Sequence, residues 1–485
     1  MNRQIRRLGV AMIVIYGVLF AWLNVVQVLR ADHYNDDPRN TRSVVRDFGR
    51  ARGQIVSADG AVLARSIDVG SHFGRQRVYP EHDLFGHVTG YYSFTFGSDG
   101  VEKTYNRDLA GRAPVRSISK LADLLRDQQT TNDVVLTISK QVQQVAKAAL
   151  GDRRGSVVAL DPRDGSVLAL WSFPSYDPEK VSQLDQDAAR AERERLLAAP
   201  DKPLLPRTFR ETFFPGSTFK VVTAAAGLTS GQVTPTQPVY PRLRELDLPD
   251  TAQTLSNFGG ETCGGALFDV LRVSCNTSFA QMGLDIGAAR LVDTAHDFGF
   301  STAPPFDLPQ SIASTVDDAS FFEQNRPLLA FTAIGQTTVR ATPLQMAMVA
   351  SAVANGGSVM TPHVMREIRD TEQDVVQRYR PSVWTTAMAP DVADLLRDGM
   401  VEVVQRGTAG RLAVPGVLTA GKTGTAQVGN GSSHTWIIGF APADAPRVAV
   451  AVIVENQRGA SEATGGRVAA PIGRAVLQAA LAASK

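Results

Sequence analysis

A serine and a lysine three residues apart, Ser217 and Lys220, form the pair in this chain best suited to covalent chemistry. Residues at this spacing lie on one face of a helix about 5 Å apart, so the two side chains can meet. A serine hydroxyl becomes a useful nucleophile when a neighbouring base takes its proton, and lysine acts as that base when burial or a nearby cation lowers its pKa. The pair therefore predicts acyl transfer through a serine ester. Taken alone, the same spacing is also typical of a solvated helix face.

The residues around this pair favour the acyl-transfer interpretation. Pro215 and Gly216 precede the serine directly and are typical of a helix start. We therefore expect Ser217 in the first turn, where free backbone N–H groups can face a developing oxyanion. Three aromatic side chains are expected to form the apolar surroundings of the lysine: Phe213, Phe214 and Phe219.

A second polar string, Ser274-Cys275-Asn276, follows Ser217 by 57 residues. We expect it to form a loop above the nucleophile, where the Ser274 hydroxyl relays a proton towards the leaving group. The Asn276 amide would hold a substrate carbonyl in the same loop. Taken alone, this string is more often a helix cap.

A third string begins at Lys422, 148 residues after Ser274, and is expected on an edge strand that lines the cleft. The hydroxyls of Thr423 and Thr425, backed by Lys422, are suited to binding a terminal carboxylate, and the Thr425 N–H to binding an oxyanion. Gly424 would let the backbone of a bound peptide approach closely. The alternative is an ordinary strand end facing solvent. Three such strings in order and far apart are hard to obtain by chance, so we expect them to form one site.

The elements that must position these residues are predicted from hydrophobic periodicity and turn signals. The expected strands are 156–160, 167–171, 435–440 and 448–455, and the expected helices are 140–150, 179–199, 344–354 and 470–482. The first two strands form a hairpin across a turn-rich connection. Strands before a block of helices, followed by strands and a closing helix, predict an α+β domain with an antiparallel sheet covered by helices.

The segment from residue 8 to residue 29 carries no charge and is long enough, at roughly 33 Å as a helix, to cross a bilayer. Three arginines precede it, and three aspartates follow it closely. This bias predicts an uncleaved anchor with residues 1–7 in the cytoplasm and the remaining chain outside. A cleaved signal peptide is the alternative. We expect a small mixed pedestal domain at 31–150 and the catalytic domain at 151–485.

Composition excludes several other classes. A net charge of +2 over 485 residues gives no electrostatic reason to expect nucleic acid. The seven histidines and two cysteines form no metal-binding pattern, and the chain has no glycine-rich phosphate loop, so no metal or cofactor is implied. We interpret His87, His363 and His434 as structural or surface residues. Cys263 and Cys275 are compatible with a disulfide outside the cytoplasm and with two buried thiols.

The three strings resemble the Ser-x-x-Lys, Ser-x-Asn and Lys-Thr-Gly signatures of penicillin-recognising enzymes. Over nearly its whole length the chain is similar to class B penicillin-binding proteins, most of all to the compact actinobacterial penicillin-binding protein A type. Further matching stretches are 52–55, 100–102 and 109–111 in the pedestal, and 173–178, 335–336 and 342–345 in the catalytic domain. The resemblance implies a penicillin-binding, serine β-lactamase-like fold.

The resemblance also implies an activity, peptidoglycan D,D-transpeptidation. Ser217 would attack the penultimate D-Ala of a stem pentapeptide and release the terminal D-Ala, with Lys220 as base. Implied partners are stem peptides, the lipid-linked precursor, β-lactams, the cytoplasmic membrane and a separate glycosyltransferase of the division or elongation machinery. A D,D-carboxypeptidase and a β-lactam-binding scaffold or sensor are the alternatives. A β-lactamase is disfavoured because no Glu-x-x-Leu-Asn string is present.

Overall fold

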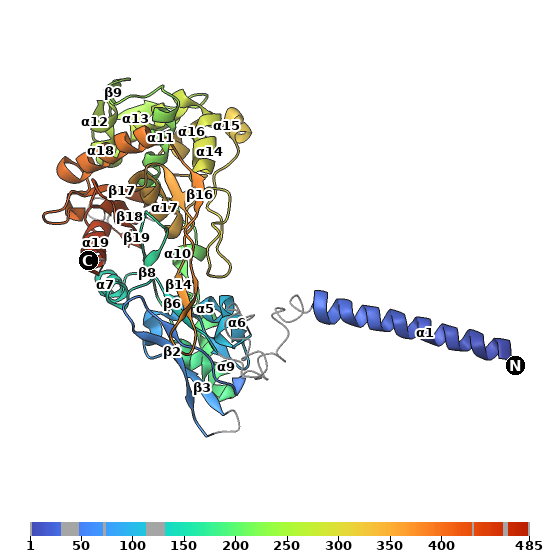
Figure 1. Ribbon diagram of the computed structural model, residues 1–485. Coiled ribbons are helices and arrows are strands. Elements are labelled where there is room, and N and C mark those ends of the chain that lie inside the picture. Colours follow the sequence, from blue (N-terminus) through green and yellow to red (C-terminus); the bar gives the residue numbers. More distant parts are fainter. Residues whose placement is uncertain are drawn as a thin grey trace.

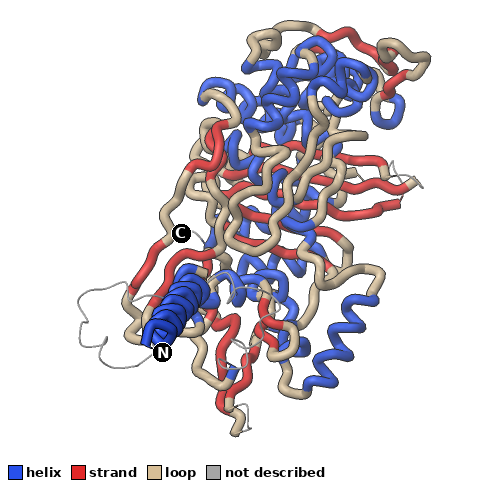
Figure 2. Tube along the Cα trace, turned by 90° about the vertical axis from the view of Figure 1, so that its right-hand side faces the viewer, coloured by secondary structure: helices blue, strands red, loops and turns tan. Residues whose placement is uncertain are grey.

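The computed structural model describes residues 2–30, 48–70, 74–112, 131–428, 431–458 and 464–483. From one end to the other, the chain after the N-terminal helix forms a helical region, a central antiparallel sheet and a smaller mixed sheet (Figure 1). The strands of the central sheet run across the middle of the molecule (Figure 2). The expected α+β class is confirmed by this architecture.

The N-terminal helix α1 (Asn2–Asn24) continues into a short π-helical segment, η1 (Val25–Leu29). It is the one helix among the described residues that is long and apolar enough to cross a membrane, and none of its apolar window is buried. The helix begins at Asn2, within the stretch expected as a cytoplasmic tail. Arg3, Arg6 and Arg7 therefore lie in its first turns. The aspartates expected after the anchor lie outside the described residues.

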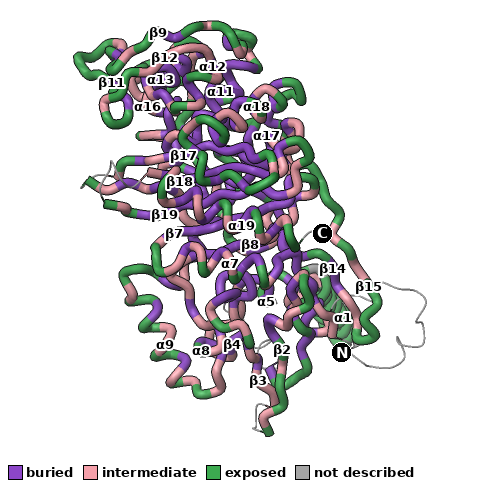
Figure 3. The backbone as a smooth tube through the Cα atoms, turned by 90° about the vertical axis from the view of Figure 1, so that its left-hand side faces the viewer, coloured by how far each residue is buried: buried purple, intermediate pink, exposed green. Residues whose placement is uncertain are grey.

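The central sheet has the order β17-β18-β19-β7-β8, and every neighbouring pair is antiparallel. Its strands are β7 (Gly155–Leu160), β8 (Val167–Phe173), β17 (Ala420–Gln427), β18 (Ser432–Ala441) and β19 (Val448–Arg458). The hairpin and the two late strands predicted from the sequence are confirmed. Because both faces are covered, the strands are buried over most of their length, as Figure 3 shows.

Helices cover the two faces of this sheet. On one face lie α7 (Lys140–Leu150) and α19 (Ala469–Ala483), which also pack against each other. On the other lie α10 (Arg207–Arg210), α17 (Pro343–Ala354) and the 3₁₀ helix η5 (Gly216–Phe219). Thr342 caps α17 by accepting the Gln345 N–H, and a proline at its first position fixes the helix start. The predicted helices at 140–150, 344–354 and 470–482 are confirmed.

A helical region continues from η5 at one end of the sheet. Its helices are α11 (Lys220–Thr229), α12 (Leu267–Arg272), α13 (Asn276–Ile286), α14 (Ala288–Asp297), α15 (Ala319–Gln324), α16 (Arg326–Ala333) and α18 (Pro390–Arg406). Short paired strands lie beside them: β9 (Tyr240–Leu243) with β12 (Cys263–Gly265), β10 (Glu245–Asp247) with β11 (Thr254–Ser256), and β13 (Ser358–Met360) with β16 (Val383–Thr386). Two 3₁₀ turns complete the region, η6 (Phe258–Gly260) and η7 (Gly410–Leu412).

The smaller sheet has the order β15-β14-β6-β1-β2-β3 and draws on two distant parts of the chain. Four strands come from the expected pedestal: β1 (Ile55–Val56), β2 (Val62–Asp68), β3 (Arg75–Val78) and β6 (Asp133–Leu136). The other two, β14 (Met365–Arg369) and β15 (Val375–Arg378), come from the middle of the catalytic part and join at β6. A boundary at residue 150 therefore divides the sequence but not this sheet.

Short elements pack around the smaller sheet. They are η2 (His82–Leu84), α4 (Gly86–Thr89), β4 (Tyr92–Ser93), β5 (Gly97–Ser98), α5 (Gly100–Thr104) and α6 (Asn106–Leu109). The polar stretch expected as one helix at 179–199 forms two, α8 (Pro178–Ser182) and α9 (Gln186–Ala198), because Asp177 and Asp185 each cap a separate helix start. Buried side chains of both helices pack against this part of the molecule.

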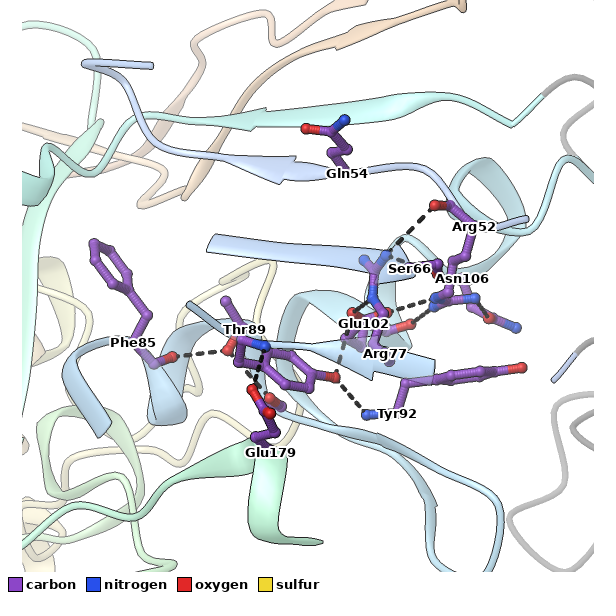
Figure 4. A network of polar contacts seen from close by, with 12 residues as sticks. Arg52, Gln54, Ser66, Arg77, Phe85, Thr89, Tyr92, Glu102, Asn106 and Glu179 are labelled. Atoms are coloured by element: carbon purple, nitrogen blue, oxygen red, sulfur yellow. Dashed lines mark hydrogen bonds and ion pairs between the residues drawn. The ribbon is translucent and has the colours of Figure 1, made fainter. Parts of the chain in front are cut away.

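A buried ionic network holds the pedestal elements together (Figure 4). The two carboxylate oxygens of Glu102 accept hydrogen bonds from Nε of Arg52 and Nε of Arg77, each at 2.6 Å. Arg52 also donates to the Glu102 carbonyl and to Asn106 Oδ1, both at 2.8 Å, and its guanidinium lies 4.1 Å from the Tyr92 ring centroid. The network joins the start of the pedestal to β3 and α5.

Polar contacts also tie the pedestal to the catalytic part. The Tyr105 hydroxyl donates to Asp307 at 2.7 Å, and Asp307 in turn accepts the N–H of Val364 at 2.8 Å. Arg210, shortly before the nucleophile segment, pairs with Asp99 at 3.2 Å. The segment that leads to η5 is therefore anchored on the pedestal side.

Candidate active site

Ser217 lies on η5, one turn before the α-helix α11 begins at Lys220. In a 3₁₀ helix the side chains at i and i+3 lie directly above one another, so this turn places Ser217 and Lys220 on one line. Gly216 has φ +54°, a conformation that favours glycine, and its N–H donates to the Gly335 carbonyl at 2.9 Å. Ser217 is partly exposed, whereas its neighbours Thr218 and Lys220 are fully buried. The helical start is confirmed, but its first turn is 3₁₀ rather than α.

The Nζ of the buried Lys220 makes three hydrogen bonds, all of them to Ser274 and Asn276 of the Ser-Cys-Asn string. Its Nζ donates to the Ser274 carbonyl at 2.7 Å, to Asn276 Oδ1 at 2.7 Å and to Ser274 Oγ at 3.3 Å. Burial, with the charge of Lys422 close by, holds the pKa of Lys220 well below its ordinary value. Lys220 is thus a buried lysine with the depressed pKa that a general base needs.

The loop that carries Ser274 has a constrained backbone. Ser274 has φ +60°, which is uncommon for a residue with a side chain and typical of functional sites. Asn276 is the first residue of α13, and Cys275 is its N-cap. The sequence offered a loop and a helix cap as alternatives for this string. The structure has both: Ser274 lies in the loop, and Cys275 is the helix N-cap.

Asn257, a residue not singled out by the sequence, holds the start of α13 in place. Its Oδ1 accepts the backbone N–H of Asn276 at 2.8 Å and that of Thr277 at 3.0 Å, so it performs the capping that Cys275 cannot provide. Its Nδ2 donates to the Leu243 carbonyl at 2.8 Å. Asn257 is 14 residues from Leu243 and 19 residues from Asn276 in the sequence. At these separations no local sequence pattern indicates the contacts, so only the fold reveals this role.

A disulfide joins Cys263 on β12 to Cys275 beside the loop, with their Cα atoms 5.8 Å apart. Of the two alternatives that the sequence left open, the structure has the bridge. It links Cys275, the middle residue of the Ser-Cys-Asn string, to the short strand β12.

Lys422 is the second buried lysine of the site. Its Nζ donates to Ser274 Oγ at 2.8 Å and to the Thr423 carbonyl at 2.9 Å. Burial lowers the pKa of Lys422 to about 7. The Ser274 hydroxyl therefore lies between the Nζ atoms of the two lysines and accepts a hydrogen bond from each. This bridge is the polar centre of the site.

The third string lies on β17, the edge strand of the central sheet, as the sequence predicted. Thr423 is buried and its hydroxyl is hydrogen-bonded to that of Thr408 at 2.7 Å. Thr425 is partly exposed, and its Oγ1 accepts the Gly465 N–H at 3.4 Å. An edge strand has backbone groups free to pair with an added strand.

Gly424 has a packing role in addition to the one expected. A Cβ atom there would lie 2.9 Å from the Pro215 carbonyl oxygen and 2.9 Å from Thr218 Cγ2. The missing side chain therefore lets β17 pack directly against η5. On the other side, Gly465 packs so closely that its own Cβ would lie 2.5 Å from the Gly424 carbonyl oxygen.

The aromatic surroundings of Lys220 also differ from the expectation. The ring of Phe279 on α13 has its centroid 5.5 Å from Lys220 Nζ. Phe219 instead packs edge-on against Phe300, and Phe213 packs against Trp436. Phe279 lies 59 positions beyond Lys220 in the sequence, so its approach depends on how α13 packs beside α11.

The three histidines expected to be structural make structural contacts. His87 is buried and Nε2 contacts the Pro203 carbonyl at 2.8 Å, while His363 stacks on Tyr379 with ring centroids 3.5 Å apart. His434 Nδ1 accepts the Asn456 N–H at 3.2 Å. Within the described ranges, no group of three or more His, Cys, Asp or Glu residues is arranged to hold a metal ion.

A Ser-x-x-Lys helix start, a Ser-x-Asn loop and a Lys-Thr-Gly edge strand on one antiparallel sheet are the arrangement of the penicillin-recognising class. The penicillin-binding protein transpeptidase domain matches residues 155–478, and the penicillin-binding protein A dimerisation domain matches residues 52–135. This chain therefore belongs to the penicillin-binding protein transpeptidase family.

Individual relatives resemble the chain over nearly its full length. It is 40% identical over 499 residues to the peptidoglycan D,D-transpeptidase PbpA of Mycolicibacterium smegmatis, with 99% of each chain covered. The PbpA of Mycobacterium tuberculosis is 37% identical, again with 99% of each chain covered. A solved ceftriaxone acyl-enzyme complex of penicillin-binding protein A from M. tuberculosis has a TM-score of 0.82 at 37% identity, and the match covers 90% of this chain and 100% of that one.

Proposed function

We propose that this protein is a membrane-anchored peptidoglycan D,D-transpeptidase that acts through an ester on Ser217 and is acylated there by β-lactams. The observation that carries the proposal is the Ser274 hydroxyl, held between the buried Nζ atoms of Lys220 and Lys422. A depressed lysine pKa in such a site supports general-base chemistry. Family membership and the named relatives support the same reaction.

In the first half-reaction, Ser217 Oγ attacks the carbonyl carbon of the penultimate D-Ala in a donor stem peptide. Neutral Lys220 takes the hydroxyl proton as the new C–O bond forms. The oxyanion is bound by the backbone N–H groups of Ser217 and Thr425. When the C–N bond to the terminal D-Ala breaks, Ser274 passes its proton to the leaving amine and takes in its place the proton that Lys220 received from Ser217, with Lys422 donating to the same oxygen.

In the second half-reaction, an amine of a neighbouring stem attacks the ester carbonyl. The new C–N bond forms, the C–O bond to Ser217 breaks and the proton of the attacking amine returns to the serine oxygen through the same groups. In the first half-reaction, before the terminal D-Ala leaves, the Asn276 amide holds the donor carbonyl and the hydroxyls of Thr423 and Thr425 hold the terminal carboxylate. Gly424 contributes by keeping this strand against η5.

A peptide assay separates this function from D,D-carboxypeptidation, which shares the first half-reaction and passes the acyl group to water. Full-length protein in detergent is incubated with a donor peptide ending in D-Ala-D-Ala, with and without an amine acceptor peptide, and the products are weighed by mass spectrometry. We expect a cross-linked dimer and free D-Ala when acceptor is present. Release of D-Ala with no dimer at any acceptor concentration would identify a carboxypeptidase, and no reaction with either a peptide or a β-lactam would favour a scaffold or sensor.

We also propose an orientation, a domain division and a partner class. Residues 1–7 lie in the cytoplasm, the chain crosses the membrane at 8–29, and the pedestal (31–150) and the transpeptidase domain (151–485) lie outside, as the arginines in the first turns of α1, ahead of the apolar segment, indicate. Because β14 and β15 belong to the catalytic part and pair with the pedestal, the two domains act as one body.

A separate glycosyltransferase of the division or elongation machinery supplies glycan strands from the lipid-linked precursor. Labelling of single cysteines placed at residue 2 and residue 485 with an impermeant thiol reagent tests the orientation.

A further inference from the structure

A threonine outside the three signature strings contacts one of them directly. Thr408 lies just after α18, and its Oγ1 is 2.7 Å from the Oγ1 of Thr423 on β17. Thr423 is only 7% exposed, whereas Thr408 is exposed. The buried hydroxyl of Thr423 therefore has as its partner a residue that is exposed to solvent.

The backbone of Thr408 is held from two directions. Its N–H donates to the carbonyl of Arg272, the last residue of α12, at 3.3 Å. Gly466 packs against it so tightly that a Cβ atom there would lie 2.4 Å from the Thr408 carbonyl oxygen. Thr408 thus bridges three segments: the helix end two residues before Ser274, the strand that carries Thr423, and the turn before α19.

The orientation of the Thr423 hydroxyl depends on this contact. A hydroxyl has one hydrogen to donate and two lone pairs to accept with. If Thr408 donates to Thr423, the Thr423 hydrogen is left to point away from Thr408, towards a bound anion, and the two hydroxyls polarise each other in the same sense. Without that donor, the Thr423 hydroxyl can turn towards another acceptor.

We propose that Thr408 is a positioning residue of the acyl-transfer reaction: its hydroxyl donates to Thr423 and so aims the Thr423 hydroxyl at the terminal carboxylate of the substrate or of a β-lactam. The proposal rests on the proposed function, because it assigns a role within the same site. Thr408 acts through Thr423 and needs no contact with the reacting atoms.

A double-mutant cycle tests this role in the full-length protein in detergent. The second-order rate constant of acylation by benzylpenicillin is measured for wild type, Thr408→Val, Thr408→Ser, Thr423→Val and the double variant Thr408→Val with Thr423→Val. Valine keeps the shape of threonine and lacks the hydroxyl, whereas serine keeps the hydroxyl. We expect Thr408→Val to slow acylation about tenfold, the usual effect of one hydrogen bond. Thr408→Ser should remain near the wild-type rate.

The cycle separates positioning from a general loss of structure. If Thr408 acts through Thr423, then adding Thr408→Val to Thr423→Val causes no further loss. Losses that multiply, equal damage by serine and valine, or an unchanged rate in Thr408→Val would each overturn the role of Thr408. Failure of the wild-type protein to be acylated at all would instead overturn the proposed function.

Discussion

Replacing Glu102 with glutamine is expected to destabilise the pedestal strongly. The Glu102 carboxylate is fully buried and pairs with two arginines whose side chains are 4% and 1% exposed. The nearby Arg52 and Arg77 charges hold the pKa of this carboxyl below its ordinary value against the opposing effect of burial. Glutamine keeps the shape of the side chain but removes the charge, which leaves two buried guanidinium groups sharing a neutral partner (Figure 4).

The size of the effect follows from the burial of these charges. Breaking a buried ion pair by removing one partner costs about 3–5 kcal/mol, because the remaining charge stays desolvated. With a urea dependence of about 2 kcal/mol per molar, the unfolding midpoint should fall by about 1.5–2.5 M. The assay is urea unfolding of the full-length protein in detergent, followed by far-ultraviolet circular dichroism, with the first transition assigned by limited proteolysis of the pedestal.

A matched surface change provides the control. Glu402→Gln also removes a carboxylate from an arginine pair, but Glu402 and Arg406 lie one turn apart on the solvent side of α18. Exposed pairs of this kind add little to stability, so the midpoint should hardly move. A Glu102→Gln midpoint equal to that of the control would show that the buried network does not hold the pedestal together.

Three further predictions concern the site. Lys422→Met should move the acid limb of the pH profile for β-lactam acylation to higher pH: below about pH 7 Lys422 is charged and its charge lowers the pKa of Lys220, so without it Lys220 keeps its proton to higher pH. An acid limb that stays in place would contradict this coupling. Replacing both Cys263 and Cys275 with alanine should lower the free energy of unfolding by about 2–4 kcal/mol, read from the urea midpoint, and an unchanged midpoint would show that the bridge adds no stability. Asn257→Ala should lower the free energy of unfolding by about 1–3 kcal/mol and slow acylation, because two backbone N–H groups lose their acceptor. Asn257→Asp keeps an acceptor oxygen and should keep most of the acylation rate. Equal acylation rates for the alanine variant and wild type would rule out the capping role.

The sequence predicted the central sheet well because its signals are local. The hairpin β7–β8 and the late strands β18 and β19 are continuous apolar runs bounded by turn residues, and such runs identify buried strands without knowledge of their partners. The three signature strings were recognisable for the same reason, since each is a short contiguous pattern. That they form one site was expected from their order and separation along the chain and from the resemblance to a known family.

Features that depend on long-range contacts could not be predicted. The strands β14 and β15 look like any short hairpin, and only the fold reveals that they complete the pedestal sheet. Asn257 and Phe279 act on the site through tertiary packing and belong to no pattern. Gly424 was correctly placed on the edge strand, but the reason for a glycine there, the approach of η5, lies in another segment.

The most direct test of the central proposal is the intact mass of the protein after incubation with benzylpenicillin, followed by peptide mapping of the modified residue. A serine nucleophile at the start of η5 predicts that wild type gains the mass of one penicillin, that the modified peptide carries it on Ser217, and that Ser217→Ala gains none. Stoichiometric labelling of Ser217→Ala, or a wild-type adduct on any other residue, would contradict the proposed site.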